Sequence, residues 1–169
     1  MIKYFAAVAV FLAGILTAAF YSSTHFTKTK PLQHREVAQV VRIIDGDTIT
    51  VDYHGTPTQV RFIGMNTPEI ADSPKGAECY GDEAAKRTKQ LVEGKNVTID
   101  TDGLQGDRDR YGRLLRYVYV GDQQINLTLI QEGYAYDWTD RYPSVYQKQF
   151  HKAEADAQKQ KRGLWGKCY

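Results

Sequence analysis

The segment DTITVDYHGTPTQVRFIG, residues 47–64, predicts two neighbouring antiparallel strands. Its first part, residues 47–53, alternates apolar and polar side chains, which is typical of a strand with one buried face. His54 and Gly55 then form a short turn signal before the run TQVRFIG, residues 58–64. The segment therefore indicates a β-hairpin.

The sequence on both sides of this hairpin predicts three further strands. Upstream, EVAQVVRIID (36–45) is rich in β-branched residues and adds the first strand of a three-stranded antiparallel meander. Downstream, NVTIDTD (96–102) and RLLRYVYV (113–120) predict two more strands, after which Gly121 and Asp122 turn the chain. We therefore expect five strands.

Two helices are predicted by their facial patterns and their ends. The segment GDEAAKRTKQLVEG (81–94) places its small and apolar side chains on one face and carries acidic residues at its start. A glycine, Gly94, marks its end. Asn126 is predicted to be the N-cap of a second, shorter helix over 127–132.

A third helix is predicted over residues 145–162. Ser144 followed by Gln147 resembles a capping box at its start, and Gly163 closes it. The order is therefore three strands, a helix, two strands and two helices. This order predicts an α+β protein, mainly β, built as a five-stranded OB-fold barrel with three helices.

The first 24 residues form a separate hydrophobic segment. After Lys3 the chain carries no formal charge up to Thr24, a stretch long enough to span a bilayer. A cleaved signal peptide is the equal alternative, because Thr17 and Ala19 form a small-x-small cleavage site. Residues 1–24 are thus a signal peptide or a signal-anchor helix, and a buried core helix is the less favoured alternative.

Either alternative brings the N-terminal segment to the membrane or the export machinery and leaves the remaining chain outside the cytoplasm, secreted or membrane-anchored. Residues 25–35 are polar and basic and contain a proline, which is typical of a linker. Residues 36–169 then form one domain, since a chain of 169 residues, 42% of them hydrophobic, has room for one ordinary core. Nothing in the sequence demands more than a monomer.

Cys79 and Cys168 are the two cysteines of the chain. An exported protein meets an oxidising compartment, so we predict a disulfide between them, with two isolated buried thiols as the alternative. The bond would tether the C-terminal tail to the middle of the chain. Closing a loop of this size stabilises the folded state by roughly 4 to 5 kcal/mol in the chain-entropy model.

Several familiar chemistries are poorly supported. The four histidines are scattered, and the sequence lacks His-x-x-x-His, Cys-x-x-Cys, G-x-S-x-G and the phosphate-loop motif. Zinc catalysis, Ser-His hydrolysis and NTP binding are therefore disfavoured. The net charge of +2 does not by itself indicate a nucleic-acid partner. Arginines nevertheless cluster in the segment DRDRYGRLLR, residues 107–116.

Carboxylates and arginines near predicted strand ends remain as candidates for chemistry. Asp45 and Asp47 flank Gly46, a pattern that indicates a hairpin turn or, alternatively, a site for a hard cation. Arg61 and Arg113 each lie near the end of a predicted strand. Either alone can be a surface arginine in a weak ion pair. Together with a cation they would form a clamp suited to a phosphoryl group.

Four motifs in this order resemble those of the thermonuclease, or staphylococcal nuclease, family. They are IDGDT (44–48), R-x-x-x-x-N-T-P-E (61–69), CYGDEA (79–84) and DRYGR (109–113). Each motif is weak alone, but the four in register are specific, and the resemblance covers about residues 37–165. It implies an OB-fold, calcium-dependent phosphodiesterase that cuts DNA and RNA and leaves 3′-phosphate ends.

The resemblance implies a metal site. Asp47 corresponds to the calcium carboxylate and Thr67 to the residue that offers its backbone carbonyl. Asn66 stands where the family's best-known pattern has a second carboxylate, so the site carries one negative charge less. We expect a lower calcium affinity, with Asp45 or water completing the coordination. Mg²⁺ is the less favoured ion.

The resemblance also implies the catalytic residues. Glu69 corresponds to the general base that activates water, while Arg61 and Arg113 stabilise the pentacoordinate phosphorus. Both roles are physically reasonable, because charge builds up on the phosphate oxygens in the transition state. A nucleic-acid-binding OB module without hydrolysis is the alternative function, but binding alone does not need these three residues at this spacing.

Substrate-binding residues are implied at two further places. Arg110 and Tyr111 fall where the family holds a terminal phosphate. Tyr142 is the expected base-stacking tyrosine, with Tyr136 and Trp138 as neighbours. Stacking on aromatic rings suits single-stranded substrates, because every base offers a π-face.

Overall fold

The computed structural model describes residues 34–74, 76–139 and 142–169. The predicted signal or anchor segment, and the predicted linker as far as residue 33, lie outside the described residues. Within the described ranges, no helix has the length and apolar content needed to cross a membrane.

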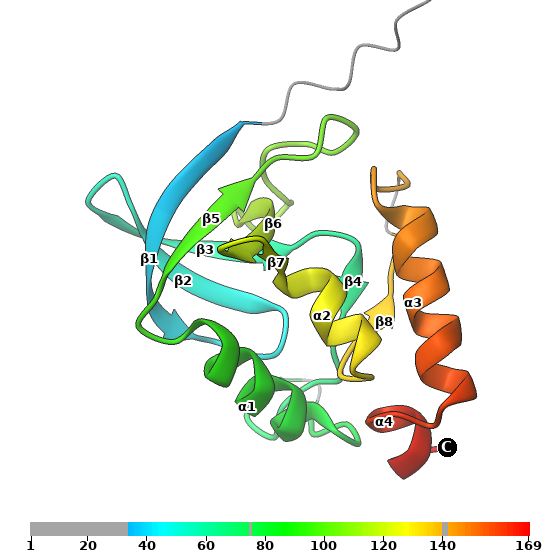
Figure 1. The fold of residues 1–169 in the computed structure, drawn as a ribbon. Coiled ribbons are helices and arrows are strands. Elements are labelled where there is room, and N and C mark those ends of the chain that lie inside the picture. Colours follow the sequence, from blue (N-terminus) through cyan, green and yellow to red (C-terminus); the bar gives the residue numbers. More distant parts are fainter. Residues whose placement is uncertain (1–33, 75, 140–141) are drawn as a thin grey trace, which may run out of the picture. The chain divides into compact units, whose positions relative to one another are not determined.

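Eight strands and four helices make up the described part (Figure 1). The strands are β1 (Arg35–Ile43), β2 (Thr48–Tyr53), β3 (Thr56–Phe62), β4 (Met65–Asn66), β5 (Asn96–Asp100), β6 (Leu114–Val120), β7 (Gln123–Gln124) and β8 (Tyr136–Asp137). The helices are α1 (Gly81–Val92), α2 (Ile125–Gln131), α3 (Gln147–Lys159) and α4 (Leu164–Lys167).

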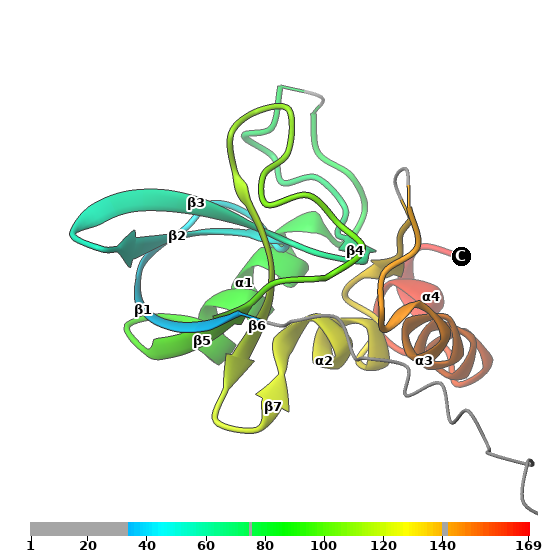
Figure 2. The same cartoon turned by 90° about the horizontal axis from the view of Figure 1, so that it is seen from above.

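Five strands close into a barrel, as predicted. The order along the sheet is β3-β2-β1-β5-β6-β7, and a parallel pairing of β3 with β6 closes the ring. Figure 2 shows these strands curving around one another, with α2 between the barrel and α3. β1 begins at Arg35, one residue before the predicted start of the domain.

The barrel is held together by side chains that point inward at every second strand position. In the hairpin of β2 and β3, the fully buried residues include Ile49, Val51, Val60 and Phe62. This alternation follows from the two-residue period of a strand and is the pattern on which the prediction depended. α2 and α3 pack on each other and add further buried apolar side chains to the same core.

Asn126 is not the cap of the second helix, so this prediction was wrong. α2 begins at Ile125 with Gln124 as the N-cap residue, and Asn126 is fully buried inside the helix. Its Oδ1 accepts a hydrogen bond from the Val118 backbone (2.9 Å), and its Nδ2 donates to the Ile63 carbonyl (3.0 Å). The amide is needed there, because buried backbone groups left without partners are costly.

The third helix is shorter than predicted. α3 runs from Gln147 to Lys159, and its N-cap is Tyr146, without a capping side-chain hydrogen bond. One of the two hydrogen bonds of the expected capping box is present, since Ser144 N donates to Gln147 Oε1 at 3.2 Å. The short elements α4, β4, β7 and β8 were not predicted, because two to four residues carry no detectable period.

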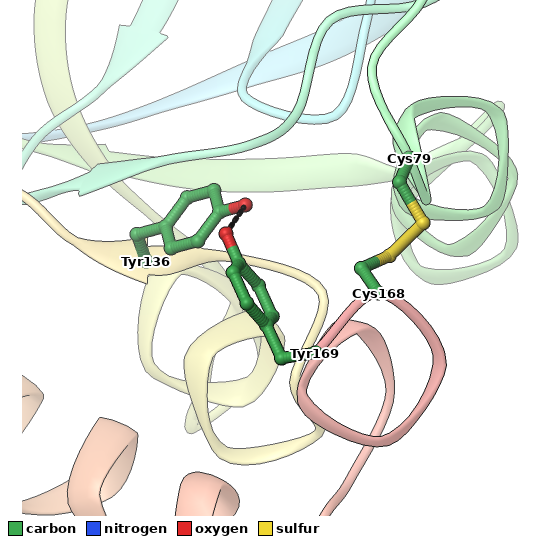
Figure 3. The surroundings of a disulfide bond; sticks show 4 residues. All are labelled: Cys79, Tyr136, Cys168 and Tyr169. Carbon is green, nitrogen blue, oxygen red and sulfur yellow. Dashed lines mark hydrogen bonds between the residues drawn. A yellow bond between two sulfur atoms is a disulfide. The ribbon is translucent and has the colours of Figure 1, made fainter.

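The predicted disulfide is present. Cys79, just before α1, is bonded to Cys168, just after α4 (Figure 3). No free cysteine remains in the chain. The bond joins the middle of the chain to its C-terminal end.

Candidate functional site

Three segments converge on the carboxylate of Asp47, in the turn between β1 and β2. Its Oδ1 pairs with Arg61 Nε at 3.1 Å and accepts a hydrogen bond from Thr48 Oγ1 at 3.0 Å. Its Oδ2 accepts a hydrogen bond from the Thr67 backbone at 2.9 Å. Asp47 and Thr67 are both buried. The structure therefore brings together the predicted metal carboxylate, one predicted clamp arginine and Thr67.

Gly46 allows the turn to come this close to Thr67. A Cβ atom at residue 46 would lie 2.7 Å from two side-chain atoms of Thr67. The turn is also tied to α1, because Thr88 Oγ1 donates to the Gly46 carbonyl at 2.6 Å. The Asp-Gly-Asp segment is thus a hairpin turn and part of the site at once.

Replacing Gly46 with alanine should destabilise the protein by about 1 to 3 kcal/mol, because the added methyl group overpacks a buried contact. Urea unfolding of the variant measures this change. Gly106→Ala is the matched control, since its Cβ would meet only the Arg108 carbonyl at 3.6 Å. Equal stability of the two variants would contradict the close approach.

Arg61 is held by all three of its guanidinium nitrogens. Besides the Asp47 pair, Nη1 donates to the carbonyls of Phe62 (2.6 Å) and Met65 (2.9 Å). Nη2 donates to Asn66 Oδ1 at 2.8 Å. The side chain is only 13% exposed. Its orientation is therefore fixed in advance, and it supports the chain path around the site.

Arg113 reaches the same region from the residue directly before β6. In the parallel pair of β3 and β6, Arg61 lies opposite Leu115, two residues beyond Arg113. Arg113 Nη1 lies 3.4 Å from Thr48 Oγ1, the hydroxyl that also donates to Asp47. The Arg113 side chain is a quarter exposed. Both predicted clamp arginines thus adjoin the Asp47 turn.

Asp109 orients Arg113. Its Oδ2 accepts from Arg113 Nε at 2.6 Å, and its Oδ1 accepts from the Arg113 backbone at 3.0 Å. Burial acts to raise the pKa of Asp109, but these hydrogen bonds, together with one from the Tyr111 backbone, outweigh it and lower the pKa. Asp109 is therefore charged at neutral pH and pairs with the guanidinium.

Asn66 makes contacts that the sequence did not indicate. Its carbonyl oxygen accepts from Arg61, and its Nδ2 donates to the Thr67 carbonyl at 3.1 Å. The Thr67 carbonyl is the group predicted to face a metal ion. An amide N–H directed at this carbonyl competes with a cation for it.

The donors around the turn fit a hard cation. Asp45 Oδ1 accepts from the Asp47 backbone at 2.9 Å, so two carboxylates share one turn, and the Thr67 backbone N–H donates to the second of them. Burial, and next the charge of Asp47, raise the pKa of Asp45 to about 6. Carboxylate and carbonyl oxygens are the ligands that Ca²⁺ prefers, and a carboxylate retains lone pairs beyond its hydrogen bonds.

Glu69 follows Thr67 by two residues and is positioned by the loop that leads to α1. Ser73 Oγ donates to Glu69 Oε2 at 2.8 Å. The Glu69 backbone N–H donates to Glu78 Oε2 at 2.9 Å, and its carbonyl accepts from the Glu78 backbone at 3.0 Å. These contacts hold the Glu69 backbone and orient its carboxylate. The role of Glu69 as general base stays a prediction.

The predicted phosphate-binding pair lies beside Arg113. Arg110 Nη2 donates to the Tyr111 hydroxyl at 2.7 Å, and its guanidinium lies 4.8 Å from the Tyr111 ring centre. Arg113 lies 5.4 Å from the same ring. Tyr111 is 68% exposed, and an open hollow of about 290 Å³ adjoins it and Arg113.

The three aromatic residues predicted at the base-stacking position lie in different surroundings. Tyr136 in β8 pairs through its backbone with Asn66 in β4, while its ring packs against Trp165 and its hydroxyl lies 3.4 Å from that of Tyr169 (Figure 3). Trp138 is 53% exposed, and its backbone donates to the Gly64 carbonyl. Tyr142 is exposed, and its described contact is a hydrogen bond from Gln105 to its carbonyl. The β4–β8 pairing therefore brings the Tyr136 backbone beside Asn66, whereas the described contacts bring neither the Tyr136 ring nor Tyr142 to the Asp47 turn.

A second group of possible metal ligands was missed by the sequence analysis. Asp137, His151 and Glu154 offer ligand atoms that all lie within 4.8 Å of one another. His151 and Glu154 are three residues apart on α3, a spacing that puts them on one helix face. The third member comes from β8, which no sequence pattern predicted.

Comparison with known proteins gave several matches. Residues 59–167 match the family model described as staphylococcal nuclease homologue. The chain is 36% identical over 132 residues to a thermonuclease of Staphylococcus hyicus, covering 78% of this chain and 77% of that protein. It is 34% identical over 144 residues to a thermonuclease of Staphylococcus intermedius, covering 83% and 82%.

A third relative is longer. The chain is 39% identical over 132 residues to the SPbeta prophage-derived endonuclease YokF of Bacillus subtilis (strain 168). The match covers 75% of this chain but only 43% of that protein. The chain therefore spans less than half of YokF and about four-fifths of each thermonuclease.

Proposed function

Since the chain belongs to the family of staphylococcal nuclease homologues, we propose that it is an exported, calcium-dependent endonuclease acting on DNA and RNA and leaving 3′-phosphate ends. One observation carries this proposal. Two arginines, one in β3 and one directly before β6, adjoin a buried carboxylate, through the Arg61–Asp47 pair and through Thr48 between Asp47 and Arg113. The two guanidiniums suit an anionic substrate, and the carboxylate suits the cation that its cleavage needs.

The two arginines counter the charge repulsion that slows phosphodiester hydrolysis. The anionic oxygens of the phosphate repel a nucleophile, and their negative charge grows in the transition state. Arg113, with its exposed edge, can donate to two of these oxygens, because a guanidinium fork matches phosphate geometry. Arg61 is already oriented and adds positive charge beside Asp47.

The remaining steps need a base and a leaving group. Glu69 takes a proton from the attacking water, whose oxygen then bonds to phosphorus. A 3′-phosphate product requires that the bond from phosphorus to the 5′ oxygen breaks, and this oxygen takes up a proton from solvent water as it leaves. A calcium ion held by Asp47 and the Thr67 carbonyl would supply positive charge to the phosphate oxygens.

Cleavage of single-stranded DNA tests this proposal. The full chain should cut the DNA with calcium present and leave it intact with a chelator. A non-catalytic binding module, the second candidate, would retain the DNA in both conditions without cutting it. Intact DNA in calcium would therefore overturn the proposed hydrolysis.

The export of the protein is tested separately. Mass spectrometry of the native N-terminus distinguishes cleavage after Ala19 from retention of residues 1–24 as an anchor. A chain recovered from the cytoplasmic fraction, with its N-terminus intact, would contradict export.

Asn66→Asp should tighten calcium binding about tenfold or more in titration calorimetry. The carboxylate would still accept from Arg61 but would add a negative charge and remove the N–H donor from the Thr67 carbonyl. A tenfold change corresponds to about 1.4 kcal/mol. Unchanged affinity would show that calcium does not bind beside Thr67.

A further inference from the structure

The backbone position of Glu69 depends on contacts with Glu78. Two hydrogen bonds join them: Glu69 N donates to Glu78 Oε2 (2.9 Å), and Glu78 N donates to the Glu69 carbonyl (3.0 Å). We refer to this pair of bonds as the Glu69–Glu78 clamp. Glu78 is exposed, so water competes for its carboxylate. The clamp is therefore weak unless something else holds Glu78 in place.

The disulfide supplies such a hold. Cys79 follows Glu78 directly and is bonded to Cys168 (Figure 3). Cys168 is itself tied to α4, since its backbone donates to the Leu164 carbonyl at 2.8 Å. Leu164 is fully buried, and its backbone donates to the Gly133 carbonyl at 2.8 Å. The bond thus connects an exposed loop to a fixed part of the core.

The start of α1 completes the surroundings of Glu69. Gly81 packs so closely on it that an added Cβ would lie 2.0 Å from the Glu69 carbonyl oxygen. Gly81 N also donates to the Glu78 carbonyl at 3.1 Å. Residues 78–81 therefore form the surface on which the Glu69 backbone rests, and the disulfide lies within this surface.

We propose that the Cys79–Cys168 disulfide is a redox gate on hydrolysis: when it is formed, it holds Glu78, a positioning residue, against Glu69, and when it is reduced, turnover falls. This inference rests on the proposed function of Glu69 as the base. Its consequence is a nuclease that is weak in a reducing compartment and reaches full activity after export.

The chemistry of the gate is thiol–disulfide exchange. In the closing direction, a low-molecular-weight disulfide accepts two electrons from the two thiols, and the sulfur–sulfur bond of the protein forms as that disulfide becomes two thiols. A dithiol reverses the reaction and is itself oxidised. Cys79 is exposed, so an attacking thiolate can reach it.

The test must separate positioning from folding, because a disulfide also stabilises the fold. We would measure kcat and KM of the full chain on single-stranded DNA, oxidised and after reduction by a dithiol, with circular dichroism to establish that the reduced chain is folded. The expected result is a fall in kcat of about tenfold with KM unchanged, since misplacing a catalytic group alone costs up to about 10²-fold. The Cys79→Ser/Cys168→Ser variant should show the same low kcat and no response to the dithiol.

Glu78 variants keep the proposal falsifiable even if the reduced chain unfolds. Glu78→Ala, with the disulfide intact, should lower kcat in the same way, whereas Glu78→Gln keeps an acceptor for the Glu69 N–H and should retain most of it. Combining Glu78→Ala with reduction should cost little more than either alone, because both act through one clamp.

The outcomes separate the two proposals. If the reduced chain is folded and cleaves DNA as fast as the oxidised chain, the redox gate is overturned and the proposed function is not. Normal kcat in Glu78→Ala also overturns it, because the disulfide would then have no path to Glu69. If the oxidised chain does not cleave at all, the proposed function fails and the gate fails with it.

Discussion

Replacing Arg113 with alanine is expected to lower kcat on single-stranded DNA by about 10³-fold, the loss typical of removing one preorganised donor to a developing oxyanion. Asp109 binds Arg113 through Nε and the backbone and so directs the guanidinium. The contact of Nη1 with Thr48 is long, at 3.4 Å, and within the described residues Nη2 donates no hydrogen bond. Nη1 and Nη2 of Arg113 are therefore left to donate hydrogen bonds to a phosphate.

Arg113 is a cleaner test than Arg61, which also binds Asp47, Asn66 and two carbonyls. Arg113→Lys keeps the charge without the two-pronged fork and should recover only part of the loss. Arg42→Ala, at an exposed arginine of β1, is the control for removing a positive charge and should keep normal kcat. An Arg113→Ala enzyme within about fivefold of the unmodified chain would contradict transition-state stabilisation by Arg113.

Glu69→Gln should lower kcat by about 10² to 10⁴-fold, the usual contribution of a general base. Glutamine has the same shape, and its carbonyl can still accept the hydrogen bond from Ser73 that Glu69 accepts now. Folding and KM for DNA should therefore stay close to normal. The loss would come from the missing proton acceptor, and steady-state kinetics with calcium would measure it.

Two controls accompany this variant. Glu83→Gln removes a negative charge from an exposed position of α1 and should leave kcat unchanged. Ser73→Ala removes only the hydroxyl that orients Glu69, so its effect should be much smaller than that of Glu69→Gln. Nearly full activity in Glu69→Gln would assign the proton transfer to another group.

The hairpin of β2 and β3 was predictable because buried apolar residues alternate along both strands. Ile49 and Val51 in β2, and Val60 and Phe62 in β3, recur at every second residue, and this pattern survives in the sequence without any tertiary information. The role of Asn126 was not predictable. An asparagine before an apolar run resembles a cap, and only the finished fold brings the Val118 and Ile63 backbones to its amide.

The candidate site was predictable in part. Asp47, Arg61 and Thr67 were placed together by their motifs, and the structure joins them by direct contacts. The contacts of Asn66 depend on exact side-chain directions, which spacing does not contain. The site residues that come from distant segments were harder still. The Tyr136 backbone adjoins Asn66 through the pairing of two-residue strands, which leave no pattern in the sequence.

A crystal structure of the full chain carrying Glu69→Gln, with calcium and a single-stranded oligonucleotide bound, tests the central claim most directly. We predict a calcium ion at about 2.3 to 2.6 Å from oxygens of Asp47 and Thr67, with Arg61 and Arg113 both donating to one phosphate. Calcium bound instead by Asp137, His151 and Glu154, or a phosphate that neither arginine touches, would contradict it.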